Sequence, residues 1–210
     1  MNTPRLASDV VARLAAAWIP NEGTQTPVHI PNRFAPSHLD RLSLPVGADR
    51  PPHQPVAFID SNAPQGFHRE ITPDAIETAD QNRGHTRVYE SVDVRSDGWH
   101  SQVSTHLARI LRRRIAVAVY ESQTGDQSLG KHRDAWDGII LQLRGAKRWT
   151  LWPELQGTPK ELSTHTGDIL IIPQGMQHDV TTPPHPGHSL HITFAVTPTP
   201  LNTASHNATP

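Results

Sequence analysis

The sequence predicts a mainly β protein, built as a barrel or a sandwich behind a few N-terminal helices. Short apolar runs bounded by glycine and proline crowd the second half of the chain, and no alternation of strand and helix accompanies them. The chain has 210 residues, of which 35% are apolar and 19% charged. This is enough to bury one core, so we expect a single domain over residues 1–196.

Two segments have the apolar spacing of amphipathic helices. In residues 6–18 the apolar side chains share one face, with Ser8 as the expected N-cap and Pro20 as the terminator. In residues 99–113 the apolar side chains again lie on one side. The arginine run 112–114 closes this helix and suits the negative end of the helix dipole.

The expected strands are short apolar runs, most of which lie after residue 113. In chain order they are residues 28–30, 56–59, 115–120, 138–143, 148–152, 168–172 and 189–196. We interpret residues 138–143 and 148–152 as the two arms of a hairpin around the tight turn 144–146. Residues 197–210 are rich in proline, threonine and asparagine, which predicts a disordered tail.

Charge and residue usage argue against several functions. A formal net charge of -1 gives no electrostatic reason to bind nucleic acid or an anionic membrane. The absence of cysteine removes disulfides, thiolate metal sites and cysteine nucleophiles. Residues 1–20 lack an apolar run long enough for a signal peptide or a membrane span, so we expect a cytoplasmic location. The 14 histidines direct attention to metal binding.

One pair of polar residues has the spacing of metal ligands. Positions i and i+2 of a strand share a face about 6–7 Å apart, so His132 and Asp134 can converge on one ion. The third ligand must come from another strand, and His178 follows the apolar segment 167–177. Two imidazoles and one carboxylate leave positions open for a bidentate cosubstrate and dioxygen, which suits iron(II). An isolated His-x-Asp pair is common by chance, so the strand context carries this interpretation.

Lys147 follows the expected hairpin turn. We expect it to enter a barrel lined by Ile139, Leu141 and Trp149, where an ammonium group without an anion is costly to bury. The distal carboxylate of 2-oxoglutarate would supply that anion. The alternative is an ordinary solvated lysine at a hairpin tip.

These residues lie in segments that resemble the Jumonji-C proteins of the cupin superfamily, specifically the ribosomal-oxygenase-like branch. The segments are residues 132–149 (HRDAWDGIILQLRGAKRW), 167–178 (GDILIIPQGMQH) and 188–193 (HSLHIT). The resemblance implies a double-stranded β-helix, or jelly-roll, barrel. It also implies an iron(II)- and 2-oxoglutarate-dependent dioxygenase that hydroxylates an amino-acid side chain of a peptide or protein.

The resemblance assigns roles to individual residues. By position, the metal ligands fall on His132, Asp134 and His178, and the cosubstrate contacts fall on Tyr120, Lys147 and Thr193. Arg133, Trp136 and Asp137 lie beside the metal motif, and we expect them to face the substrate.

Two alternatives remain open from the sequence. Larger ribosomal oxygenases carry a helical dimerisation region and a winged-helix domain after the barrel, for which we find no counterpart after Val196. The same chemistry on a small molecule or a carrier-tethered amino acid is therefore one alternative, and a homodimer is compatible with either substrate class. The alternative of another class is a non-catalytic cupin that only binds ligands. Retention of the metal triad together with Lys147 argues against that class.

Overall fold

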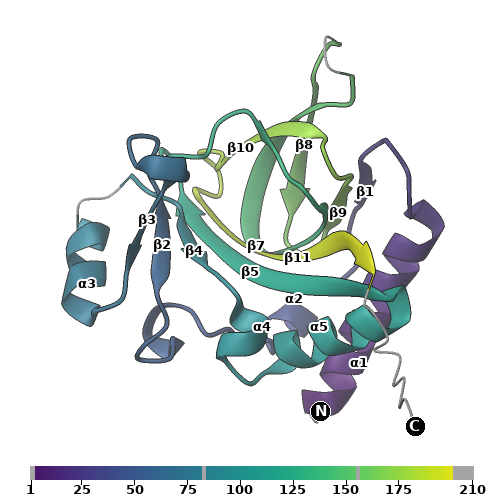
Figure 1. Ribbon diagram of the computed structural model, residues 1–210, viewed down its shortest axis with the longest axis horizontal. Coiled ribbons are helices and arrows are strands. Elements are labelled where there is room, and N and C mark those ends of the chain that lie inside the picture. Colours follow the sequence, from purple (N-terminus) through teal and green to yellow (C-terminus); the bar gives the residue numbers. More distant parts are fainter. Residues whose placement is uncertain (1–2, 82–83, 155–156, 201–210) are drawn as a thin grey trace, which may run out of the picture.

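A computed structural model describes residues 3–81, 84–154 and 157–200, and it confirms the mainly β fold (Figure 1). The strands are β1 Val28–Ile30, β2 Val56–Ile59, β3 Phe67–Glu70, β4 Arg87–Tyr89, β5 Arg113–Gln123, β6 His132–Arg133, β7 Asp137–Trp152, β8 Lys160–His165, β9 Ile169–Ile172, β10 Gln177–Thr181 and β11 His188–Pro200. The main sheet has the order β1-β9-β7-β11-β5-β4-β2-β3. Strands β8 and β10 pair with β7 outside this path, and β6 pairs with β10. The result is a jelly-roll barrel.

The predicted hairpin around Gly145 is wrong, because β7 runs through that position as one continuous strand. Its first half pairs with β9 and β11, and its second half pairs with β8 and β10. The register against β11 shifts where Arg144 lies opposite Leu190 and Gln142 lies opposite His191. Leu143 is therefore the extra residue of a β-bulge, and Gly145 continues the strand with a φ of +69°. The bulge bends β7 from one sheet into the other.

The bulge also changes which β7 side chains face the barrel interior. Before it, the even-numbered Gly138 and Ile140 face inward, and after it the odd-numbered Lys147 and Trp149 do. Side chains alternate strictly along a regular strand, so one extra residue inverts the pattern. Ile139 and Leu141 were expected beside Lys147, but they pack on the opposite face of β7, in the main core. That expectation was wrong for this reason.

The helices are α1 Thr3–Trp18, α2 Pro36–Leu39, α3 Pro73–Gln81, α4 Val92–Arg95 and α5 Trp99–Leu111. Helices α1, α4 and α5 lie below the main sheet in Figure 1, and α3 lies beside β3 at its edge. The predicted apolar faces of α1 and α5 are confirmed, since Leu14 and Leu107 are fully buried in the main core. Helix α1 begins at Thr3, three residues before the predicted start, with Pro4 in its first turn, where proline is favoured. Ser8 therefore lies inside the helix and is not its cap.

Helix α5 ends at Leu111, two residues before the predicted end. Arg112 adopts the left-handed conformation, with a φ of 52°, and its N–H donates to the carbonyl of Ala108. Arg113 and Arg114 already belong to β5. The arginine run therefore spans the junction between helix and strand, and only its first member caps the helix.

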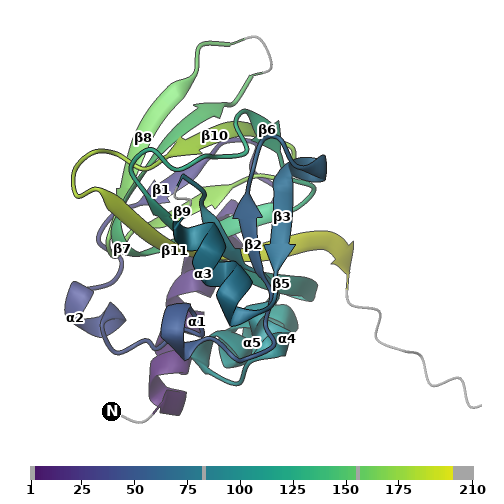
Figure 2. The same cartoon turned by 90° about the vertical axis from the view of Figure 1, so that its left-hand side faces the viewer.

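Strands β4, β2 and β3 extend the main sheet beyond β5, with α3 beside them (Figure 2). At the other end of the chain, β11 continues to Pro200, so residues 197–200, which we expected in the tail, are strand. The rest of the predicted tail, residues 201–210, lies outside the described residues. Within the described part of the chain, no helix has both the length and the apolar character needed to cross a membrane.

We expect Gly145→Ala to destabilise the fold by at least about 2 kcal/mol, because it combines left-handed strain with a steric clash. A Cβ atom at this position would collide with the carbonyl oxygen of His188 on β11. Gly125→Ala is the matched control, since Gly125 also has a positive φ of 89° but no atom within 4 Å of its added Cβ. Urea unfolding measures both variants. Equal losses would show that close approach of the two strands does not constrain the bulge.

Candidate metal centre

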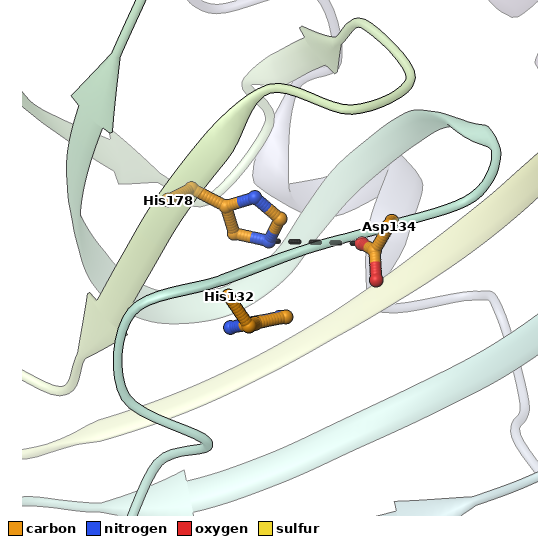
Figure 3. A group of neighbouring side chains, drawn as sticks. All are labelled: His132, Asp134 and His178. Carbon is orange, nitrogen blue, oxygen red and sulfur yellow. Dashed lines mark ion pairs between the residues drawn. The ribbon is translucent and has the colours of Figure 1, made fainter. Parts of the chain in front are cut away.

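Three potential metal ligands converge where β6 pairs with β10. His132 lies directly opposite His178 in this antiparallel pair, and Asp134 follows β6 by one residue. The ligand atoms of the three residues all lie within 4.8 Å of one another. The His178 Nε2 and the Asp134 Oδ2 are 3.6 Å apart (Figure 3). The backbone carbonyl of Asp134 also accepts a hydrogen bond from Gly175, which holds the residue in place beyond the end of β6.

Both imidazoles are held with one nitrogen free. The Nδ1 of His132 lies 2.7 Å from the carbonyl of Gly130, and the Nδ1 of His178 lies 3.0 Å from the carbonyl of Met176. A carbonyl only accepts, so each Nδ1 carries a proton, and the neutral form of each ring then presents the Nε2 lone pair. Burial lowers the pKa of His178, and His132 lowers it further. Two neutral imidazoles and a carboxylate fit a divalent transition metal with open positions.

A hydroxyl positions the loop that orients His132. Ser128 Oγ donates to Asp179 Oδ1 over 3.0 Å and accepts from the N–H of Gly130 over 3.1 Å. Gly130 is the residue whose carbonyl holds the His132 ring. Ser128 therefore links β10, beside His178, to the backbone that orients His132.

The metal centre opens into a cavity of about 290 Å³ inside the barrel. Each residue predicted as a metal or cosubstrate contact lines it, namely His132, Asp134, His178, Tyr120, Lys147 and Thr193. Arg133 and Trp136, two of the three expected substrate-facing residues, line it as well. Asp137 does not, because it alternates with Trp136 and Gly138 and points to the other face. Its carboxylate instead accepts a hydrogen bond from Gln174 N, so the expected substrate role of Asp137 is withdrawn.

Lys147 is buried at one end of this cavity. Its side chain is 2% exposed, which excludes the alternative of a solvated turn lysine. The ammonium donates to Ser122 Oγ at 2.7 Å and to Thr182 Oγ1 at 3.2 Å. Burial lowers the pKa of Lys147 to about 8, and Asp126 offsets this only in part. No carboxylate of the described residues lies within ion-pair distance, so the ammonium is suited to an anionic ligand.

Sequence reasoning missed three residues at this end of the cavity. His191 stacks on Tyr120 with ring centroids 4.9 Å apart, and its buried Nδ1 has no hydrogen-bond partner among the described residues. Burial lowers the pKa of His191 well below its usual value, and Lys147 lowers it further. Ser122 and Thr182 are the hydroxyls that hold Lys147. Side chains two positions apart on a strand share a face, and this rule could have identified His191 and Ser122. His191 precedes Thr193 by two residues, and Ser122 follows Tyr120 by two.

A buried polar network connects the β7 bulge to the cavity wall. Gln142 is fully buried, and its amide group donates to the carbonyl of Arg144 and to Ser189 Oγ, both at 2.9 Å. Its side-chain oxygen accepts a hydrogen bond from Thr164, whose hydroxyl accepts one from the Trp149 indole. The network satisfies a carbonyl at the bulge and fixes the indole that lines the cavity.

The chain is similar in sequence to a known protein family and to several curated proteins. A family model described as "JmjC domain" matches residues 95–203. Ribosomal oxygenase 2 of Rattus norvegicus is 28% identical over 131 residues, which cover 55% of this chain and 28% of that protein. The bifunctional lysine-specific demethylase and histidyl-hydroxylase NO66 of Drosophila willistoni is 31% identical over 102 residues, 39% of this chain and 13% of that protein. The chain thus spans under a third of the length of these relatives.

Solved structures confirm the jelly-roll fold. The ribosomal oxygenase YcfD of Escherichia coli, in complex with cobalt and succinic acid, matches with a TM-score of 0.58 at 20% identity. The match covers 87% of this chain and 51% of that one. The same protein in complex with cobalt and 2-oxoglutarate matches with a TM-score of 0.55 at 17% identity, with the same coverage.

We expect Ser128→Ala to weaken Co(II) binding by about tenfold, because groups that orient a ligating histidine commonly contribute that much to affinity. Thr124→Ala is the control, since this hydroxyl lies in the same loop but donates to the carbonyl of Pro183. Titration calorimetry with Co(II) measures both. If Ser128→Ala binds Co(II) as tightly as Thr124→Ala does, the hydroxyl does not orient His132.

We expect Lys147→Met to raise the free energy of unfolding at pH 7 by about 2 kcal/mol, because it removes a desolvated charge and keeps an apolar stem. The pKa of Lys147 is about 8 in the fold, against 10.5 for an exposed lysine. The penalty is therefore complete below pH 8 and fades as the pH rises toward 10.5, since the unfolded chain then holds more protons. Urea unfolding at pH 7 and pH 9.5 measures the difference. A variant less stable than wild type at pH 7 would contradict this account.

Proposed function

The chain belongs to the JmjC domain family, and on this premise we propose that it is an iron(II)- and 2-oxoglutarate-dependent oxygenase that hydroxylates an amino-acid side chain of a peptide or protein. The observation that carries the proposal is one cavity lined by the His132, Asp134 and His178 cluster and by a buried ammonium that has no carboxylate partner among the described residues. A metal site alone would serve many chemistries. A metal site and a buried cation in the same cavity suit a metal-chelating dicarboxylate.

The three clustered side chains would hold the metal. His132 and His178 offer Nε2, because their Nδ1 atoms donate to backbone carbonyls, and Asp134 offers its carboxylate. Bound iron(II) would supply oxygen activation, in which dioxygen oxidises 2-oxoglutarate to succinate and carbon dioxide and one oxygen atom enters a C–H bond of the substrate.

Lys147, Tyr120 and Thr193 would bind the distal carboxylate of 2-oxoglutarate. Burial raises the pKa of Tyr120, so its phenol keeps its proton and can donate a hydrogen bond. Ser122 and Thr182 hold the Lys147 ammonium at the end of the cavity. A charge-assisted contact in this dry environment is stronger than the same contact in water. The chain would thus bind the distal carboxylate of the cosubstrate at one end of the cavity and the metal at the other.

The remaining walls would keep water from the reacting atoms. Ile140, Trp149 and Ile172 line the cavity and belong to one buried apolar cluster. The Trp149 indole is fixed by its hydrogen bond to Thr164. A rigid apolar wall leaves little room for solvent beside the metal centre.

A protein or peptide substrate is supported by the relatives. One is named a ribosomal oxygenase, and the other a lysine-specific demethylase and histidyl-hydroxylase, a name that refers to amino-acid side chains. Hydroxylation would be seen as one added oxygen atom in the target.

We expect wild-type protein with iron(II), ascorbate and 2-oxoglutarate to form succinate, and Asp134→Ala to form at least about 100-fold less, because it loses an anionic ligand. Lys147→Met should raise the KM for 2-oxoglutarate by at least about tenfold, because the carboxylate loses its charged donor. The measurement is succinate formation followed by proton NMR.

Lys160→Met is the matched control for Lys147→Met, because Lys160 is an exposed lysine of β8 that does not line the cavity. Its KM should equal that of wild type. Metal binding without any succinate formation would instead favour a non-catalytic cupin.

A further inference from the structure

The cavity has a second, apolar wall on the side where the main sheet continues beyond β5. Ile59 of β2 and Phe67 of β3 lie opposite each other in an antiparallel pair, and Leu129 comes from the loop between β5 and β6. The three belong to one cluster, against which Tyr120 also packs. Trp136, just after the metal motif, lines the same cavity. The hydroxyls that hold Lys147, those of Ser122 and Thr182, are not part of this wall.

The apolar wall is held in place by the loop itself. Gln127 Oε1 accepts from both the N–H and the hydroxyl of Ser61, each at 3.1 Å, and the Gln127 carbonyl accepts from Thr86 Oγ1 at 2.9 Å. The β2–β3 turn packs closely on Leu129, since a Cβ added to Gly66 would lie 2.8 Å from the leucine Cδ2. The wall is therefore a preformed surface that requires no rearrangement to receive a side chain.

The charges around the wall select against cations. Among the described residues that line the cavity, Asp134 is the only carboxylate, and it is the proposed anionic metal ligand. The two basic side chains of the lining are Lys147 inside the cavity and Arg133. The Arg133 side chain is exposed and makes no hydrogen bond or ion pair with the part of the chain that the structure describes. The hydroxyls of Thr86 and Ser128 already donate to Gln127 and Asp179.

We propose that the side chain that enters this cavity for hydroxylation is uncharged and apolar, and that basic side chains are rejected. The inference rests on the proposed oxygenase function and names the substrate class for that site. An apolar side chain gains by leaving water for the wall of Ile59, Phe67 and Leu129. A guanidinium or ammonium group would pass Arg133, lose its hydration and find no free carboxylate beside the metal and Lys147.

The test compares two probes that differ in the side chain alone, N-acetyl-leucinamide and N-acetyl-argininamide. Their affinities are measured by saturation-transfer NMR with 2-oxoglutarate and Zn(II), a redox-inactive, diamagnetic substitute for iron(II). We expect wild-type protein to bind the leucine probe at least about tenfold more tightly. Leu129→Glu should shift the ratio toward the arginine probe by about tenfold, because it places a carboxylate in the wall. Leu129→Gln, of similar size and uncharged, should weaken the leucine probe without favouring arginine.

Leu129 is half-buried, and circular dichroism of both variants verifies that they fold. The inference is overturned if wild type prefers the arginine probe, binds the two equally or binds neither, or if the Glu and Gln variants behave alike. Succinate formation by the wild type is assayed on the same preparation. If the protein forms succinate but prefers the arginine probe, the proposed oxygenase function is supported and the inference about the substrate side chain is wrong. If the protein prefers the leucine probe but forms no succinate, the proposed oxygenase function is wrong and the apolar selectivity of the cavity still stands.

Discussion

The β-bulge at Leu143 is the constraint on which the cavity depends. One extra residue in β7 reverses the inward face of the strand, so Ile140 and Lys147, seven positions apart, both face the barrel interior. In a regular strand an odd separation places two side chains on opposite faces. Gln142 satisfies a backbone carbonyl at the bulge, and Gly145 allows β11 to approach closely. The same irregularity also carries β7 from the main sheet into the pairing with β8 and β10.

The fold accepts a buried ammonium that weakens it. Within the part of the chain that the structure describes, the Lys147 ammonium has only hydroxyl partners, and burial lowers its pKa to about 8. Such a group is costly in a free protein and becomes favourable when an anion binds beside it. Burial lowers the pKa of His191 well below its usual value, and the Lys147 ammonium lowers it further. The His191 imidazole is therefore neutral beside the charged lysine. Stability is thus exchanged for a site prepared for a carboxylate, as is common where binding residues are buried.

The metal centre and the apolar wall of the cavity come from different parts of the chain. The β6–β10 pair brings His132 and His178 together, and backbone carbonyls set both ring orientations. The wall comes from β2, β3 and the loop around Leu129, which lie on the extension of the main sheet. Ser128 and Leu129 are neighbours in that loop, so one segment both orients a proposed metal ligand and shapes the space for substrate.

The sequence by itself determined the mainly β class, the two long helices, most strands and the spacing of His132 and Asp134, because these depend on local periodicity. Only the tertiary structure decided what happens at Gly145, since its local pattern suits a tight turn as well as a bulge. Pairing of β7 with the distant β11 selects the bulge. As a result Lys147 faces the cavity, whereas Ile139 and Leu141 face the main core. The contacts of Ser122, Thr182 and His191, and the wall at Leu129, likewise arise between segments far apart in the chain, whose register no local pattern contains.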